Sequence, residues 1–238
     1  MIVVRSGRNR PGRRAILGLA ALAAIGVWVA FDLAGPVHAD LRVFDPEPVA
    51  RLDTQMWRDY YERKPVPLVL DLAALLRQQF HFPYLRSYVA SFYASRGAFT
   101  FKRGHERADY LRALPDLREY FGAIRRISTT PFDVPRAAEL ELEWWILHRG
   151  RGPRDPEGLA KSLADAAAVL YEVPAESLMT YGRLRGEAMT LRDQHALEGG
   201  MRESDWIRVR ALLDQAWASL WRTVRNNPPR ALAVVPRE

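Results

Sequence analysis

The sequence predicts an all-α protein, in which one N-terminal transmembrane helix precedes an antiparallel helical bundle or curved array of about seven or eight helices. Three observations lead to this fold class. Apolar side chains recur at helical spacing in most segments. Proline, glycine and capping residues divide the chain at short intervals. No stretch shows the alternation of apolar and polar residues that a half-buried strand requires.

The first predicted element is a transmembrane helix over residues 15–34. Five arginines precede it within residues 1–14, and residues 15–31 carry no charge. At about 1.5 Å per residue, a helix of this length approaches the roughly 30 Å of a bilayer core. Because arginines before a span resist translocation, we expect residues 1–14 in the cytoplasm and residues 40–227 on the periplasmic side of the inner membrane. The segment is either a retained anchor or a signal peptide cleaved after Ala39.

Most of the excess positive charge belongs to this leader. The whole chain has a net charge of +7, but residues 40–238 hold thirty basic and twenty-seven acidic residues, a net of +3. A nucleic-acid-binding domain would show a stronger basic footprint, so we expect no nucleic-acid partner. The chain contains no cysteine, and the outer domain is therefore expected to depend on its core rather than on disulfides.

Helix-start signals follow one another through the first part of the outer domain. Asp45 and Pro46 form a cap and a first-turn proline, which predict a helix that ends near Lys64. Further along, Pro115 predicts either a kink or the start of a new helix. The expected helices of this part are 45–64, 68–80, 84–101, 106–127 and 133–150.

The second part of the outer domain begins with a segment rich in glycine, proline and arginine. This segment, 149–155, predicts either a boundary between two subdomains or a long interhelical loop. Asp155 and the proline after it then predict a helix start. Another helix is expected from Pro174 to Gly199, and a last one from about 204 to 225 has the most regular apolar spacing in the chain. A short tail over residues 228–238 completes the predicted organisation.

Motifs for metal, phosphate or nucleophile chemistry are missing from the sequence. A di-iron site in a helical bundle needs a glutamate three residues before a histidine, and none of the 5 histidines has one. Zinc motifs built on cysteine or on H-E-x-x-H are absent, as are the P-loop and the G-x-S-x-G elbow. We therefore expect no metal and no cofactor, and we assign no catalytic residue.

An acidic and aromatic cluster lies on the predicted helix 133–150. Glu141 and His148 are two turns apart on the side that also carries Trp144 and Trp145. One interpretation is a polar site in which the indoles raise the pKa of the Glu141 carboxyl group. The other is a core helix whose acids are solvated or paired with arginine. Glu141 and His148 are thus the candidate polar site.

Aromatic side chains supply a candidate partner interface. Trp57, Tyr60 and Tyr61 follow soon after the membrane segment among arginines, and this composition is typical of interfaces. Core packing is the alternative for each of these side chains. The candidate interface residues are Trp57, Tyr60, Tyr61, Trp144, Trp145 and Trp206.

Three segments resemble an uncharacterised group of bacterial proteins that carry an N-terminal hydrophobic segment. They are WRDYYERK at 57–64, HFPYLRSY at 81–88 and LELEWW at 140–145. The resemblance covers most of the outer domain. It implies an all-helical, membrane-anchored protein in a bacterial setting, and it implies no activity, cofactor or site residue.

Three functions compete at this stage. The leading hypothesis is a non-enzymatic accessory or scaffold subunit that lies at the lipid bilayer and binds an integral-membrane complex; respiratory, photosynthetic, transport and envelope complexes are not distinguished. The first alternative is an envelope enzyme that cleaves glycan as lytic transglycosylases do, with Glu139, Glu141 or Glu143 as general acid. The second alternative is a helical protein that binds a small molecule or pigment between its helices.

Overall fold

Prolines and capping residues set the starts of several helices in the structure, a computed structural model that describes residues 13–151 and 155–227. Within those ranges every regular element is helical, and the only β-pairing is a single bridge between Ala39 and Ser128. The predicted all-α class is confirmed. The elements are α1 (Arg13–Ala34), α2 (Pro46–Tyr61), α3 (Pro65–Phe80), α4 (Tyr84–Arg103), α5 (Arg107–Leu111), α6 (Leu114–Ile127), α7 (Val134–Arg151), α8 (Pro156–Tyr171), the 3₁₀ turn η2 (Ala175–Leu178), α9 (Met179–Leu197) and α10 (Glu203–Asn226).

Two of the predicted caps are hydrogen-bonded as expected. The Asp45 side chain accepts from the Glu47 N–H at 3.1 Å, and the Asp155 side chain accepts from the Gly158 N–H at 2.7 Å. Each satisfies one of the donors that a helix N-terminus leaves unpaired. Pro115 starts a new helix, so the segment around it forms two elements, α5 and α6. The described residues therefore contain nine α-helices after α1, rather than the predicted seven or eight.

The chain divides into a unit that ends at Pro36 and a unit that begins at Val37. In the first unit, α1 is long and apolar enough to cross a membrane. Its apolar side chains are exposed, with Leu22 at 67% and Val27 at 71%. Lipid would cover these side chains favourably. The predicted basic segment lies mostly within 1–12, and like the predicted tail it is outside the described residues.

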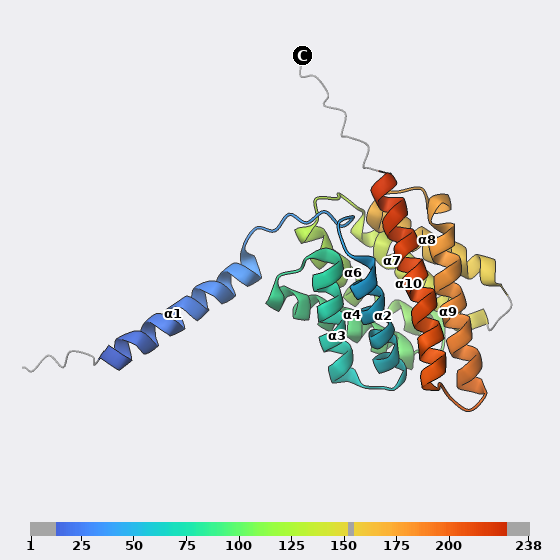
Figure 1. Ribbon diagram of the computed structural model, residues 1–238, viewed down its shortest axis with the longest axis horizontal. Helices are drawn as coiled ribbons and strands as arrows, with labels where there is room; N and C mark the ends of the chain where they lie inside the picture. Colours follow the sequence, from blue (N-terminus) through green and yellow to red (C-terminus); the bar gives the residue numbers. More distant parts are fainter. Residues whose placement is uncertain (1–12, 152–154, 228–238) are drawn as a thin grey trace, which may run out of the picture. The chain divides into compact units, whose positions relative to one another are not determined.

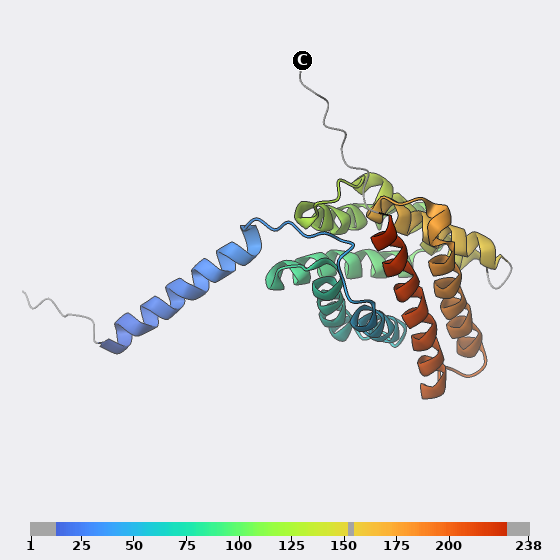
Figure 2. The ribbon, with the colours of Figure 1, turned by 45° about the horizontal axis from the view of Figure 1, so that its top comes forward.

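In the second unit, eight helices pack side by side in a closed series that we call the helical ring. α2 contacts α3, α3 contacts α4, and the series continues through α6, α7, α8, α9 and α10, which returns to contact α2. Figure 1 shows α9 and α10 running alongside each other, and in Figure 2 α4 lies between α3 and α6. Among the neighbouring pairs of this series, only α10 and α2 are far apart in the sequence, and their contact closes the ring.

A glycine allows the closest approach between α8 and α9. A Cβ atom on Gly182 would lie 2.1 Å from the carbonyl oxygen of Ala160, which is far inside van der Waals contact. One turn further along, a Cβ atom on Gly186 would meet Leu159 at 3.6 Å, an ordinary contact distance. The two helices therefore meet through their backbones at Gly182 and through side chains at Gly186.

Backbone hydrogen bonds at Ala39 fix the segment that leads into the helical ring. The Ala39 N–H donates to the Ile127 oxygen at 2.7 Å, and the Thr129 N–H donates to the Ala39 oxygen at 2.9 Å. Ala39 is 6% exposed. The residue before the candidate cleavage bond is therefore an integral part of the second unit.

Candidate ligand-binding cavity

The helical ring contains a cavity of about 900 Å³, which we call the central cavity. Side chains from all eight helices of the ring line it. Folded interiors are normally packed as densely as organic crystals, with few voids larger than a water molecule. Small-molecule pockets span roughly 300–1,000 Å³, so the central cavity is large enough for a ligand. Its aromatic lining residues are Trp57, Tyr60, Tyr61, Phe80, Phe101, Tyr120, Phe121, Trp144, Trp145, Tyr171, Tyr181 and Trp217.

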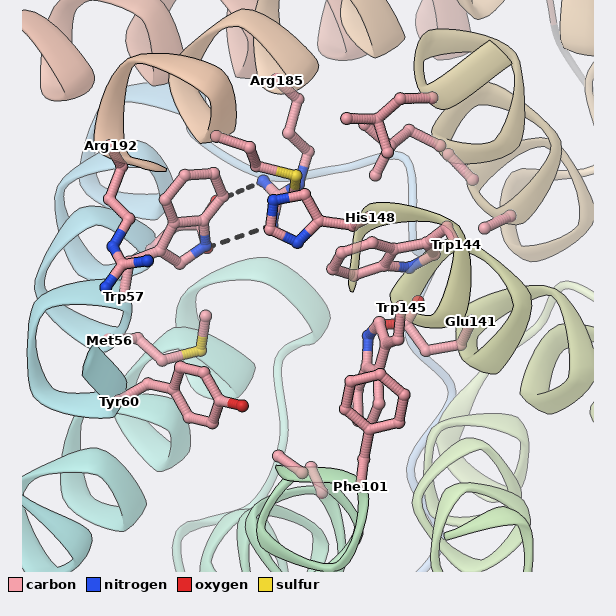
Figure 3. A pocket seen from close by; sticks show the side chains of 18 of the residues that line it. Met56, Trp57, Tyr60, Phe101, Glu141, Trp144, Trp145, His148, Arg185 and Arg192 are labelled. Carbon is pink, nitrogen blue, oxygen red and sulfur yellow. Dashed lines mark hydrogen bonds and ion pairs between the residues drawn. The ribbon is translucent and has the colours of Figure 1, made fainter. Parts of the chain in front are cut away.

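α2 contributes one continuous stripe to the wall of the central cavity. Asp53, Met56, Trp57, Tyr60 and Tyr61 follow the spacing that places side chains on one face of a helix. Figure 3 shows the side chains of Met56 and Tyr60 on the opposite side of the space from Trp145. The early aromatic cluster of the sequence thus faces into the ring.

α7 contributes a second stripe with the same spacing. Glu141, Trp144, Trp145, His148 and Arg149 all line the central cavity. The Trp145 indole N–H donates to Glu141 Oε1 at 3.0 Å. Burial raises the pKa of Glu141, and hydrogen bonds from the indoles of Trp144 and Trp145 oppose the rise without cancelling it. The neutral carboxylic acid is therefore favoured more strongly here than in water.

The most deeply buried charges of the wall are Arg185 on α9 and Asp53 on α2. Both terminal guanidinium nitrogens of Arg185 bond the Asp53 carboxylate, the Nη2–Oδ1 distance being 3.3 Å. The Trp217 indole N–H also donates to Asp53, at 2.8 Å. Burial alone would lower the pKa of Arg185, but the charge and hydrogen bond of Asp53, together with the charges of Tyr181 and Glu141, outweigh it, and the net shift is upward. The guanidinium lies 5.1 Å from the ring centre of Trp57, which adds a cation–π contact.

Two turns further along α9, Arg192 lies at the edge of the central cavity. Its guanidinium lies 3.3 Å from the ring centre of Tyr61, and its Nη1 donates to Asp193 at 2.8 Å. His148 Nε2 lies 2.8 Å from the other Asp193 oxygen. Burial alone would raise the pKa of Asp193, but His148 and Arg192 outweigh it and hold the pKa below its usual value. The Nε of Arg192 is buried and has no hydrogen-bond partner in the described part of the chain.

The structure brings together seven of the eight residues that the sequence singled out. Glu141, His148, Trp144, Trp145 and the three aromatic residues of α2 all line the central cavity. Trp206 does not; it is 5% exposed and packs in the core beneath the Arg58 guanidinium, 5.8 Å from the ring centre. Trp57 is also buried, at 6% exposure.

Among the three neighbouring glutamates of α7, only Glu141 lines the central cavity. Glu143 bonds Arg107, the Nη1–Oε2 distance being 3.2 Å, and Glu139 lies 3.8 Å from Arg118. Both of these ion pairs are exposed. The polar character of the cavity wall on α7 therefore comes from Glu141, His148 and Arg149.

Sequence reasoning missed the polar residues that α9 contributes, above all Arg185 and Arg192. Arg185 pairs with a residue 132 positions earlier, and no local pattern links the two. The available signal was the stripe on α2, where Asp53 shares a face with aromatic side chains and would need a buried partner. In the described residues, no three metal-ligating side chains are grouped so as to hold a metal ion.

No family model, no curated protein and no solved structure matches this chain. The central cavity and the predicted membrane segment are therefore the features that indicate a function.

Proposed function

We propose that this protein is a membrane-anchored helical bundle that binds an apolar or amphipathic small molecule in its central cavity. The observation that carries the proposal is the cavity itself, about 900 Å³ within a ring of helices whose side chains otherwise form a packed core. A concave space of this size lets an apolar molecule bury much of its surface against the protein. Its aromatic wall with a few polar groups is the usual composition of a ligand pocket.

The same proposal places the helical domain on the periplasmic side of the inner membrane, attached by a single span with a cytoplasmic N-terminus. The support is the arginine-rich segment before an uncharged stretch long enough to cross a bilayer. A protein held at a membrane meets lipid-soluble compounds at high local concentration. An apolar ligand suits that setting.

The accessory-subunit hypothesis depends on attachment to the bilayer by one span and on aromatic, arginine-rich contact segments; of its six candidate interface residues, five line the central cavity and the sixth, Trp206, is buried. The glycan-cleaving hypothesis is favoured by one observation, the raised pKa of Glu141 in an apolar wall. It requires that Glu141→Gln abolish the release of muropeptides from purified cell wall. Equal release by Glu141→Gln would exclude it.

A cavity-filling substitution tests the binding proposal. Ala98 on α4 lines the central cavity, so Ala98→Trp would occupy part of the space. Ala108 on α5 is exposed, and Ala108→Trp is the matched control. The full-length protein in nonionic detergent would be mixed with the uncharged probe 1-aminoanthracene, and native mass spectrometry would count bound probe molecules.

We expect one probe molecule to bind the wild type and Ala108→Trp, and Ala98→Trp to bind it at least about tenfold more weakly, because the ring loses room for a tricyclic molecule. Thermal unfolding followed by circular dichroism would confirm that both variants are folded. Equal binding by a folded Ala98→Trp, or no stoichiometric binding to the wild type, would refute the proposal.

A further inference from the structure

Four cationic side chains lie close together where α2 ends beside the central cavity. Lys102 lies 4.4 Å from the ring centre of Tyr60, and Arg192 lies 3.3 Å from that of Tyr61. Arg149 lies 4.3 Å from the ring centre of Phe101, the neighbour of Lys102. We call these three residues and Arg63, just beyond α2, the cationic cluster.

The cationic cluster holds more positive charge than the protein neutralises. Among the described residues, Arg63, Lys102 and Arg149 form no ion pair with a carboxylate, and Arg192 shares Asp193 with His148. Burial and then the charges of Arg63, Arg192 and Arg149 lower the pKa of Lys102. Like charges close together in a partly buried site repel one another, and an anion bound between them would relieve that repulsion.

Backbone carbonyls hold the cluster in place without neutralising it. The Lys102 ammonium donates to the Tyr60 oxygen at 3.1 Å, at the C-terminal end of α2. Arg149 Nη1 donates to the oxygens of Phe101 and Gly104, both at 2.9 Å, at the end of α4. The negative ends of two helix dipoles thus position the cations. Lys102 retains further N–H donors, and the Nε of Arg192 has no partner in the described chain.

We propose that the ligand of the central cavity is an anionic amphiphile, whose apolar body lies against the aromatic wall and whose carboxylate or phosphate binds Lys102, Arg149 and Arg192. This inference rests on the proposed function and adds the chemical class of the ligand. Two lining residues, Arg149 and Arg192, belong to both the wall and the cluster, so one molecule can reach both. Glu141, whose pKa burial raises, adds less repulsion toward an anion than an ordinary glutamate would.

The test compares two probes with the same apolar chain, cis-parinaric acid, whose carboxylate is charged, and its uncharged methyl ester. Full-length wild type in nonionic detergent should bind the acid at least about tenfold more tightly than the ester, because a charge-assisted hydrogen bond contributes this much or more. Lys102→Met should weaken acid binding about tenfold and leave ester binding unchanged. Lys161→Met, which removes an exposed lysine of α8 paired with Asp165, is the matched control and should change neither.

A second variant guards against misfolding of Lys102→Met. Arg63 is exposed, so Arg63→Gln is expected to fold, and it should weaken acid binding by about threefold through loss of a more distant charge. Equal affinity for the acid and the ester in wild type would overturn the assignment of an anionic ligand while leaving the cavity proposal intact. If neither cis-parinaric acid nor its ester bound, and 1-aminoanthracene did not bind either, the proposed function itself would be refuted.

Inorganic phosphate distinguishes a lipid-like ligand from a free anion. We expect it to bind only weakly, because it cannot use the aromatic wall, and to displace cis-parinaric acid only at concentrations above roughly 10 mM. Tight binding of phosphate, below roughly 0.1 mM and lost in Lys102→Met, would assign the cluster to a free anion and refute the amphiphile.

Discussion

Arg185 and Arg192 lie two turns apart on α9, and each combines an aromatic contact with an aspartate. In the first half of the helix, Arg185 is 9% exposed and is paired with Asp53. In the second half, Arg192 borders the central cavity with a spare Nε, and its partner Asp193 has a side chain that is 41% exposed. The same residue types therefore stabilise the fold where their partners are complete, and offer a binding group where they are not.

The largest effect should come from breaking the buried pair. Asp53→Ala leaves the Arg185 guanidinium buried without its carboxylate, and we expect the free energy of unfolding to fall by about 3–5 kcal/mol. Denaturant unfolding of the full-length protein in nonionic detergent measures this change. Asp193→Ala, in the exposed half, should lose less than about 1 kcal/mol. Equal losses in the two variants would show that the halves of α9 do not differ as described.

A third aspartate sharpens the comparison, because it shares the burial of Asp53 but lacks an arginine partner. Asp59 is 2% exposed, and its neighbour is Asp71. Burial, followed by the interaction with Asp71, raises the pKa of Asp59 from 3.8 to about 6. The folded state therefore binds a proton that the unfolded state releases, so stability falls as the pH rises from about 4 to about 6 and stays lower above it.

Asp59→Asn removes that penalty and should raise the free energy of unfolding by about 3 kcal/mol at pH 8, with a much smaller gain at pH 4. Denaturant titrations at the two pH values measure the difference. Asp165→Asn, which removes a partner of exposed Lys161, should change stability by less than about 0.5 kcal/mol at both. An Asp59→Asn variant that is less stable than the wild type at pH 8 would contradict the assigned shift.

The close approach in the first half of α9 provides the next test. Gly182→Ala forces a methyl group onto the Ala160 carbonyl oxygen, and we expect a loss of about 1–3 kcal/mol. Gly186→Ala has room and should be neutral or stabilising by up to about 1 kcal/mol, because alanine favours the helix. Thermal unfolding of the pair measures both. If Gly182→Ala and Gly186→Ala had the same effect on stability, the close backbone contact between α8 and α9 at Gly182 would be contradicted.

The smallest change in stability is expected in the second half of α9. Arg192→Met removes a cation–π contact with Tyr61 and an ion pair with half-exposed Asp193, so the loss should be below about 1 kcal/mol. The same variant should bind cis-parinaric acid about tenfold more weakly. If Arg192→Met lost much stability but bound cis-parinaric acid as tightly as the wild type, Arg192 would be shown to have a structural role like that of Arg185.

Local signals made most of the fold predictable. Asp45, Asp155 and Pro115 act through their own helix termini, so each start could be predicted from a few neighbouring residues. Helical spacing likewise placed Glu141 and His148 on one face with two indoles. Which neighbour that face would meet was not predictable, because it depends on packing between helices distant in sequence.

The closure of the ring and the pairing of Asp53 with Arg185 are the clearest examples of features that could not be predicted from the sequence. α10 contacts α2 across most of the chain, and the apolar spacing of either helix fits many partners. The central cavity was equally hidden, since aromatic stripes that enclose a space have the same pattern as stripes that fill one. Whether aromatic stripes enclose a cavity or fill a core depends on how closely the facing helices approach, which the sequence pattern does not show.

The burial of Ala39 restricts when a signal peptidase could act. Proteases need their target bond accessible and free to extend, whereas the N–H and the carbonyl oxygen of Ala39 are hydrogen-bonded to the last residue of α6 and to the connection that follows it. Once the ring has closed, the backbone on the N-terminal side of the bond after Ala39 is buried and held by hydrogen bonds. Cleavage after Ala39 would therefore have to precede folding of the helical ring. A leader that is still attached when the ring has folded would stay attached.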